Sequence, residues 1–125
     1  MKELTKAEEQ VMHLLWQLEK AYVKDIIELM PEPKPAYNTV STIIRILETK
    51  EFVGHEAFGK TYRYFPLIKK ETYTQFYMKN FLSGYFGGSF KKMVSFFTDK
   101  EEVNVKEMEE ILQLMQAQIK QKKDG

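Results

Sequence analysis

The chain contains no cysteine among its 125 residues. Disulfides, cysteine-ligated zinc sites and thiol catalysis are therefore excluded. It also has little excess of charge of either sign, because 19 lysine and arginine residues stand against 18 acidic residues, which gives a net charge of +1. The net charge gives no support to nucleic-acid binding, so any basic surface must be local.

Long apolar runs are absent as well. No stretch approaches the roughly 20 apolar residues that a membrane-spanning helix needs, and no N-terminal run resembles a signal peptide. We therefore expect a cytoplasmic protein. The length suffices for a domain with its own core and an appendage, and the change in composition near Lys69 predicts two parts, 1–68 and 69–125.

Residues 37–50 are predicted to form the amphipathic helix around which the chain is organised. Val40, Ile43, Ile44 and Leu47 recur at the i, i+3, i+4, i+7 spacing of a face that packs onto a core. Short side chains on the other face let the helix approach another surface closely, and asparagine and arginine carry paired hydrogen-bonding groups suited to base edges. The residues of that face are Asn38, Ser41, Thr42, Arg45 and Thr49.

A β-hairpin is predicted at residues 52–66. Both halves have the composition of strands, Phe58-Gly59-Lys60 forms the turn, and Pro66 ends the second strand at an edge. A helix with a polar face followed by a basic-tipped hairpin is typical of a winged helix-turn-helix. The sequence therefore predicts a mainly α protein with a small β-hairpin wing, in which a winged helix-turn-helix domain precedes a C-terminal helical dimerisation region.

Two earlier helices complete the predicted domain. Thr5 and Glu8 are expected to form a capping box at the start of the first helix. Residues 21–23 are predicted to form a short bridging strand that pairs with the hairpin. Residues 24–30 are predicted to form a second helix, which the following prolines terminate.

The C-terminal part is predicted to contain three helices, over residues 70–85, after Ser89 and over residues 105–121. Their apolar faces are too wide for a small domain that already has a core, so they imply a partner, and a second copy is the simplest one. A ligand pocket lined by the aromatic side chains is the alternative. The candidate dimer contacts are Tyr73, Phe76, Tyr77, Phe81, Phe90, Met93, Phe97, Ile111, Leu112 and Met115.

Seven residues are candidate DNA contacts. Arg45 is expected to contact a phosphate or a guanine edge, and Asn38 and Thr39 to hold a phosphate at the helix N-terminus. Lys60 and Arg63 are expected to reach phosphates or the minor groove from the wing, with ordinary solvated charge as the alternative. The full set is Asn38, Thr39, Ser41, Thr42, Arg45, Lys60 and Arg63.

No pattern of residues indicates catalysis, and we expect neither enzyme activity nor a cofactor. His13 and His55 are isolated, so no metal site is expected, and no nucleophile lies beside a base. Five acidic residues of the C-terminal part are expected to be solvated rather than paired for catalysis, namely Glu101, Glu102, Glu107, Glu109 and Glu110.

Several strings in a fixed order cover nearly the whole chain. They are Leu4-Thr5-Lys6-Ala7-Glu8, Leu15-Trp16, Tyr37-Asn38-Thr39-Val40 with Thr42 and Leu47, Gly59-Lys60-Thr61-Tyr62-Arg63-Tyr64 with Pro66, and Phe86-Gly87-Gly88-Ser89. In these strings the sequence resembles the BlaI/MecI/CopY family of repressors, also called the penicillinase-repressor family. The resemblance implies a homodimeric winged-helix repressor of operators with inverted repeats.

The resemblance also implies a mode of release. Many family members are inactivated when a membrane-bound sensor metalloprotease triggers cleavage in their C-terminal part, so such a protease, acting indirectly, is an expected partner. The bond that is Asn-Phe in the staphylococcal members corresponds here to Ser95-Phe96, which is the candidate cleavage site. The Cys-x-Cys copper motif of the CopY branch is excluded, because the chain has no cysteine.

Two residues in the helix at 37–50 and its exit depart from the family pattern. The family usually has arginine where this chain has Ile46, so Arg45 supplies the charge one position earlier. It usually has glycine where this chain has Glu51, so the exit of the helix is expected to use another geometry.

We therefore expect a homodimeric transcriptional repressor that binds a double-stranded inverted-repeat operator, without membrane insertion. Release is expected by sensor-triggered cleavage or by disruption of the dimer. The alternative is a winged-helix protein–protein interaction module without a DNA role, which the balanced charge favours. The salt dependence of duplex binding discriminates between the two, because phosphate contacts release counterions.

Overall fold

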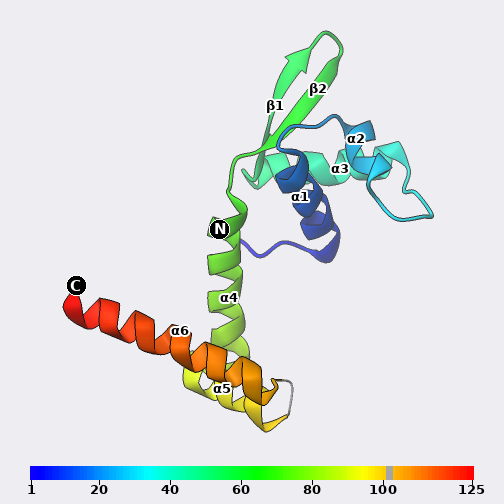
Figure 1. The fold of residues 1–125 in the computed structure, drawn as a ribbon. Coiled ribbons are helices and arrows are strands. Elements are labelled where there is room, and N and C mark those ends of the chain that lie inside the picture. The colour runs from blue at the N-terminus through cyan, green and yellow to red at the C-terminus, as the bar shows by residue number, and fades with distance from the viewer. Residues whose placement is uncertain (101–102) are drawn as a thin grey trace. The chain divides into compact units, whose positions relative to one another are not determined.

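A computed structural model describes residues 1–100 and 103–125 of the chain. Glu101 and Glu102, which the sequence places among the solvated acidic residues, lie outside the described residues. The chain divides into two compact units, Met1–Met78 and Lys79–Gly125, and each is described by itself. The described residues form six helices and one antiparallel hairpin, which Figure 1 labels. The prediction of a mainly helical protein with a small hairpin is confirmed.

The N-terminal unit contains three helices, the hairpin and the first part of a fourth helix. In chain order these elements are α1 (Lys6–Leu18), α2 (Val23–Glu28), α3 (Tyr37–Thr49), β1 (Val53–Phe58), β2 (Thr61–Pro66) and α4 (Lys70–Phe86).

A capping box fixes the start of α1. The Thr5 hydroxyl accepts a hydrogen bond from the Glu8 backbone N–H at 3.2 Å, and the Glu8 carboxylate accepts one from the Thr5 N–H at 2.9 Å. Each bond satisfies a backbone donor that the first turn of a helix leaves without a partner. The capping box predicted from the sequence is confirmed.

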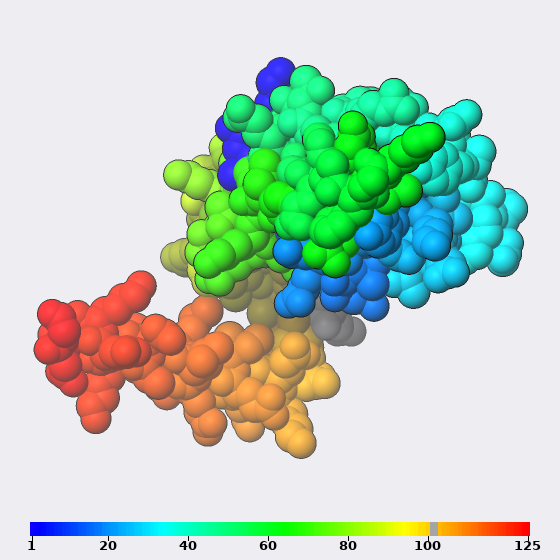
Figure 2. Space-filling model, turned by 90° about the horizontal axis from the view of Figure 1, so that it is seen from above, coloured from blue at the N-terminus to red at the C-terminus, as the bar shows by residue number. Residues whose placement is uncertain are grey.

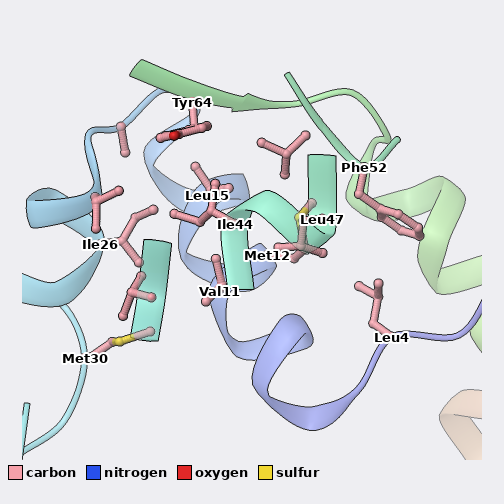
Figure 3. Packing of buried hydrophobic residues seen from close by; sticks show 14 of the residues in the cluster. Leu4, Val11, Met12, Leu15, Ile26, Met30, Ile44, Leu47, Phe52 and Tyr64 are labelled. Atoms are coloured by element: carbon pink, nitrogen blue, oxygen red, sulfur yellow. The ribbon is translucent and has the colours of Figure 1, made fainter. Parts of the chain in front are cut away.

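The core of the N-terminal unit lies between α1, α2, α3 and the base of the hairpin, as Figure 3 shows. Val11, Leu15, Ile26, Ile44 and Leu47 are fully buried there. Burial of each such side chain stabilises the fold by about 1.5–3 kcal/mol. Because this core holds the apolar stripe of α3, the opposite face of that helix turns outward.

The hairpin is tied to the start of α2. The two strands pair with Val53 opposite Pro66, and Gly59 has a φ of +62°, as the first central residue of a type II′ turn requires. Ala21 forms a bridge with Tyr64 through two N–O distances of 2.9 and 2.7 Å. The predicted pairing of the bridging strand is confirmed, but it is limited to Ala21, because α2 already begins at Val23.

The bounds of α2 differ from the predicted 24–30. Its start lies earlier because the Asp25 carboxylate accepts a hydrogen bond from the Tyr22 N–H at 2.9 Å. Its end lies at Glu28, and the Lys34 ammonium donates to the carbonyls of Glu28 and Met30 at 2.7 and 2.6 Å. Lys34 thus satisfies acceptors that the end of a helix leaves open.

The exit from α3 corrects one expectation. Glu51 has a φ of +65°, its N–H donates to the Glu48 carbonyl, and the Phe52 N–H donates to the Leu47 carbonyl, both at 2.9 Å. These two bonds are those of a Schellman motif, whose left-handed residue is usually glycine. Glu51 keeps the geometry that glycine favours, so the prediction of another geometry was wrong.

The C-terminal unit contains the end of α4, α5 (Phe90–Asp99) and α6 (Val105–Asp124). The Ser89 hydroxyl caps α5 by accepting from the Lys92 N–H at 3.1 Å, as predicted, and the Asn104 side chain caps α6 by accepting from the Glu107 N–H at 2.8 Å. No described residue of α5 or α6 is fully buried. Among the described residues, no helix combines the length and apolarity needed to cross a membrane.

Candidate nucleic-acid interface

The outward face of α3 presents short polar side chains beside one arginine. Asn38, Thr39, Thr42 and Arg45 are exposed, and the first turn carries no acidic residue. The Thr42 hydroxyl donates to the Asn38 carbonyl at 2.8 Å. The Thr42 side chain therefore offers the lone pairs of its hydroxyl and a methyl group to a binding partner, while Arg45 offers several N–H donors.

Ser41 does not lie on this outward face, although the sequence placed it there. It is 8% exposed, and its hydroxyl oxygen accepts a hydrogen bond from a guanidinium nitrogen of Arg45 at 3.3 Å. At 3.6 residues per turn Ser41 lies about 60° from Ile44, at the margin of the buried stripe. The structure makes Ser41 a support for Arg45 rather than part of the exposed surface.

The N-terminus of α3 is open. Its N-cap residue is Ala36, and no side chain of the described residues caps the helix. The Thr39 N–H donates to the Ala36 carbonyl at 3.1 Å, and no side chain among the described residues accepts from the N–H groups of Tyr37 and Asn38. The positive end of the helix dipole therefore lies beside Asn38 and Thr39. Such an end is suited to an anion.

The two basic residues of the wing are held differently. Lys60 is exposed in the turn. The Arg63 guanidinium lies 4.9 Å from the centre of the Phe58 ring and 3.7 Å from the carboxylate of Glu56, its partner across the hairpin. In the part of the chain that the structure describes, its Nε is buried without a hydrogen-bond partner. Arg63 is thus pre-positioned along the hairpin.

Glu56 is shared by two cations. The Lys20 ammonium lies 3.0 Å from one oxygen of its carboxylate, and the Arg63 guanidinium lies 3.7 Å from the other. The hydrogen bond from Lys20 is the main reason why the pKa of the Glu56 carboxyl lies below its ordinary value. Glu56 therefore stays ionised and offsets part of the positive charge of the wing.

A histidine connects the wing to α3, which the sequence did not predict. The His55 Nδ1 contacts the carboxylate of Glu48, and the His55 ring lies 4.3 Å from that of Tyr62. In the sequence His55 stands alone, because its partners come from α3 and from the other strand. This contact sets the position of the wing relative to the outward face of α3.

A hollow lies where α2, α3 and β2 meet, and the sequence does not predict it. Figure 2, seen from the side of the hairpin, shows the green hairpin beside the blue and cyan segments that contain α2 and the start of α3. The hollow is lined by Tyr22, Val23, Lys24, Tyr37, Thr61 and Tyr62. No local signal marks this set, because its members come from three separate stretches of chain.

Lys50 is engaged inside the fold and is not a free cation beside α3. Its ammonium lies 2.8 and 3.0 Å from the two oxygens of the Glu8 carboxylate, and Glu8 is only 4% exposed. Burial alone would raise the pKa of this carboxyl, but the hydrogen bonds from Lys50 and Thr5 outweigh burial and lower it. The pair joins the first turn of α1 to the end of α3.

Six of the candidate dimer contacts line one apolar groove between α5 and α6. They are Phe90, Met93, Phe97, Ile111, Leu112 and Met115, and the groove has a volume of about 390 Å³. Phe90 and Leu112 remain 52% and 56% exposed.

The candidate dimer contacts on α4 differ in whether they are buried or exposed. Tyr73 is 4% exposed, its hydroxyl accepts from the Leu4 N–H at 2.8 Å, and its ring packs edge-on against Phe52. Phe76 packs against the same core. Tyr73 therefore stabilises the N-terminal unit and offers no surface to a partner, whereas Tyr77 is exposed. Phe81 lies in the C-terminal unit, where its ring packs on other aromatic rings of α4.

The candidate cleavage bond, Ser95–Phe96, lies in the middle of α5. Both residues are exposed, and the Phe96 ring packs edge-on against Phe86 and Phe97. Because the bond is helical, it does not have the extended form of an open loop. Among the described residues, no group of three or more histidine, aspartate or glutamate side chains is placed to hold a metal ion.

The helical core, the outward polar face of α3 and the adjoining hairpin define a winged-helix protein. A sequence model described as penicillinase repressor matches residues 4–117. The chain belongs to this family, whose members are transcriptional repressors rather than enzymes.

Curated relatives and a solved structure agree with this assignment. The methicillin resistance regulatory protein MecI of Staphylococcus aureus (strain N315) is 28% identical over 114 residues, which cover 90% of this chain and 93% of MecI. The penicillinase repressor of Staphylococcus aureus is 29% identical over 114 residues, 90% of each chain. The solution structure of the DNA-binding domain of the repressor BlaI matches with a TM-score of 0.50 and 26% identity, covering 58% of this chain and 94% of that domain.

Proposed function

We propose that the chain is a homodimeric transcriptional repressor that binds a double-stranded operator with an inverted repeat. Residues 1–68 provide the DNA-binding domain and residues 69–125 the dimerisation region. The observation that carries the proposal is the outward face of α3, where Asn38, Thr42 and Arg45 are exposed together. Membership of a repressor family, and the likeness to the DNA-binding domain of BlaI, support the same reading.

In this proposal α3 enters the major groove and the wing contacts the flanking backbone. Arg45 is the main donor to a base edge or a phosphate, and Ser41 fixes the direction of its guanidinium. Asn38 and Thr39 hold a phosphate at the open N-terminus of α3. Lys60 and Arg63 contact the backbone from the wing, with Arg63 already aligned by Phe58 and Glu56.

The dimer is proposed to form through the C-terminal unit. The groove between α5 and α6 exposes large apolar side chains, and exposed apolar patches of this kind mark interaction sites. A second copy is the proposed occupant, because a two-fold dimer presents two α3 helices to the two halves of an inverted repeat. Release of the operator follows disruption of this dimer, for example after sensor-triggered cleavage at Ser95–Phe96.

The test is a titration of the purified protein against two duplexes at two salt concentrations. One duplex carries an inverted repeat from upstream of its own coding sequence, and the other is a scrambled version. The proposal expects strong preference for the repeat, two chains per duplex, and a steep loss of affinity with salt. Equal and weak binding to both duplexes, with little salt dependence, would instead support a protein–protein interaction module.

A further inference from the structure

The hollow between α2, α3 and β2 has the chemistry of an anion site. Its polar lining is Tyr22, Tyr37, Tyr62, Lys24 and Thr61, whose hydroxyl donates to the Phe58 carbonyl at 2.8 Å, and no carboxylate of the described residues lines it. Tyr37 and Tyr62 are 57% and 49% exposed, and neither of their hydroxyls has a hydrogen-bond partner among the described residues. The hollow thus holds an ammonium and two unused O–H donors.

The nearest acidic side chain in the sequence is directed elsewhere. The Asp25 carboxylate accepts a hydrogen bond from the Tyr22 backbone N–H at 2.9 Å, within the first turn of α2. The open N-terminus of α3 adds to the positive potential, because Tyr37 is the first residue of that helix and no side chain caps it. These features favour an oxyanion over a neutral or cationic ligand.

The position of the hollow indicates which oxyanion it would meet. When α3 lies in a major groove and the wing reaches the adjoining minor groove, one sugar–phosphate strand must pass between them, because that strand separates the two grooves. The hollow lies at this place, with Tyr37 on the α3 side and Thr61 and Tyr62 on the wing side. The contact of His55 with Glu48 fixes the spacing between the two sides.

We propose that this hollow is a subsite for one phosphodiester group of the operator backbone, an inference that rests on the proposed function. The Lys24 ammonium neutralises the phosphate charge, and the hydroxyls of Tyr37 and Tyr62 donate hydrogen bonds to its free oxygens. A contact of this kind sets the register of the protein on the duplex without reading a base. None of these residues belongs to the DNA contacts predicted from the sequence.

The experiment uses the full chain and a set of inverted-repeat duplexes, each with one backbone phosphate replaced by an uncharged methylphosphonate. Affinity is measured for the wild type, for Tyr37→Phe and Tyr62→Phe, and for Tyr85→Phe as the matched control, since Tyr85 is 77% exposed on the other unit. We expect replacement of one phosphate to weaken wild-type binding about 3- to 10-fold. At that phosphate alone, the effect should be lost in Tyr37→Phe or Tyr62→Phe and kept in Tyr85→Phe.

Charge is tested separately. Lys24→Gln should lower the slope of log affinity against log salt by about one, for repeat and scrambled duplex alike. Lys106→Gln, which removes an exposed charge at the start of α6, is the control and should leave the slope unchanged. Circular dichroism melting of each variant confirms that removal of an exposed hydroxyl or ammonium leaves the fold intact.

The outcomes separate the subsite from the proposed function. If the protein prefers the repeat, but the effects of the tyrosine substitutions and of the phosphate replacements are additive at every phosphate, the subsite is overturned and the proposed repressor function is retained. Loss of any preference for the repeat would overturn both. A titration with inorganic phosphate distinguishes the source of the anion. If free phosphate binds saturably, Tyr37→Phe abolishes this binding, and the effects on the duplex are additive, the hollow binds a soluble anion. That result would overturn its role on DNA.

Discussion

At the scale of single residues, Arg45 carries the most specific expectation. Its guanidinium is exposed on α3 and is oriented by the buried hydroxyl of Ser41. We expect Arg45→Ala to weaken operator binding by about 1–3 kcal/mol with the fold intact. Fluorescence anisotropy with the inverted-repeat duplex measures the loss.

The conservative variant Arg45→Lys distinguishes a base contact from a phosphate contact. A lysine keeps the charge but not the planar pair of donors that a guanine edge accepts. If Arg45 reads a base, the variant loses preference for the repeat, whereas a phosphate contact survives as a point charge. Unchanged operator affinity in Arg45→Ala would show that this residue does not contribute to the interface.

The backbone conformation of Glu51 is expected to lower the stability of the protein. It adopts a φ of +65° at the end of α3, where a side chain is strained and glycine is not. We expect Glu51→Gly to raise the free energy of unfolding by about 0.5–1 kcal/mol, because relief of strain exceeds the added entropy of the unfolded chain. Urea unfolding should show a higher midpoint with an unchanged slope.

The control for this variant is Thr49→Gly, which places glycine at the last helical residue of α3. There glycine has no strain to relieve, so stability should fall by up to about 1 kcal/mol. A fall in stability for both variants would mean that Glu51 gains more from its side chain than it loses in its backbone.

At the scale of elements, the pair of Glu8 and Lys50 fixes α1 to the end of α3. Because Glu8 is 4% exposed and its carboxyl pKa is lowered in the folded state, folding favours the ionised form. We expect Glu8→Gln to lower the free energy of unfolding by about 1–3 kcal/mol at neutral pH. Urea unfolding of both proteins measures this difference.

The pH dependence of that difference follows from the lowered pKa. The stabilisation is fully present above the ordinary glutamate value of 4.5 and is lost as the pH falls through the lower folded value. The two proteins should therefore approach equal stability in acid. Glu71→Gln, at an exposed position of the same unit, provides the comparison. A difference that stays constant from neutral to acid pH would show that the charge of Glu8 is not what stabilises the contact.

Elements with strong local signals could be predicted from the sequence. The apolar spacing of α3, the Thr5 and Glu8 capping box and the Ser89 cap are all read within a few residues of chain, and each is present. Features that depend on distant partners could not be predicted. Tyr73 bonds to Leu4, 69 residues away, and the hollow at Tyr37 is assembled from three stretches.

Two errors at the candidate site have physical reasons within single elements. Ser41 lies at the edge of the apolar stripe, where a small change in helix rotation decides between burial and exposure, and packing on the core buries it. Glu51 shows that a Schellman motif forms without glycine when the following apolar residue, here the buried Phe52, holds the exit in place.

At the scale of the whole molecule, the proposed function requires the groove between α5 and α6 to be covered by a second chain. We expect Met93→Asp or Phe90→Asp to give monomers, because a charge would have to enter a desolvated apolar contact. Light scattering measures the mass. Leu114→Asp is the matched control, since Leu114 is 62% exposed on α6 but does not line the groove.

The same variants test how assembly supports recognition. A monomer holds one half of the repeat with one α3, so its affinity for the full operator should fall far more than that of Leu114→Asp. A Met93→Asp protein that keeps its dimer mass would place the interface elsewhere. A monomer with full operator affinity would show that operator binding does not require a two-fold dimer.

If the protein is released by the proposed cleavage at Ser95–Phe96, the helical position of this bond has a consequence for the timing of induction. A protease requires an extended segment, so it would cut only those molecules in which α5 has opened locally. In the proposed dimer the second chain covers α5, so dimer formation, which the two-fold operator favours, lowers the open fraction by mass action. Repressor bound at its operator would then be the last population to be destroyed, and the pool free in solution would be degraded first. The response would show a delay that lengthens with repressor concentration.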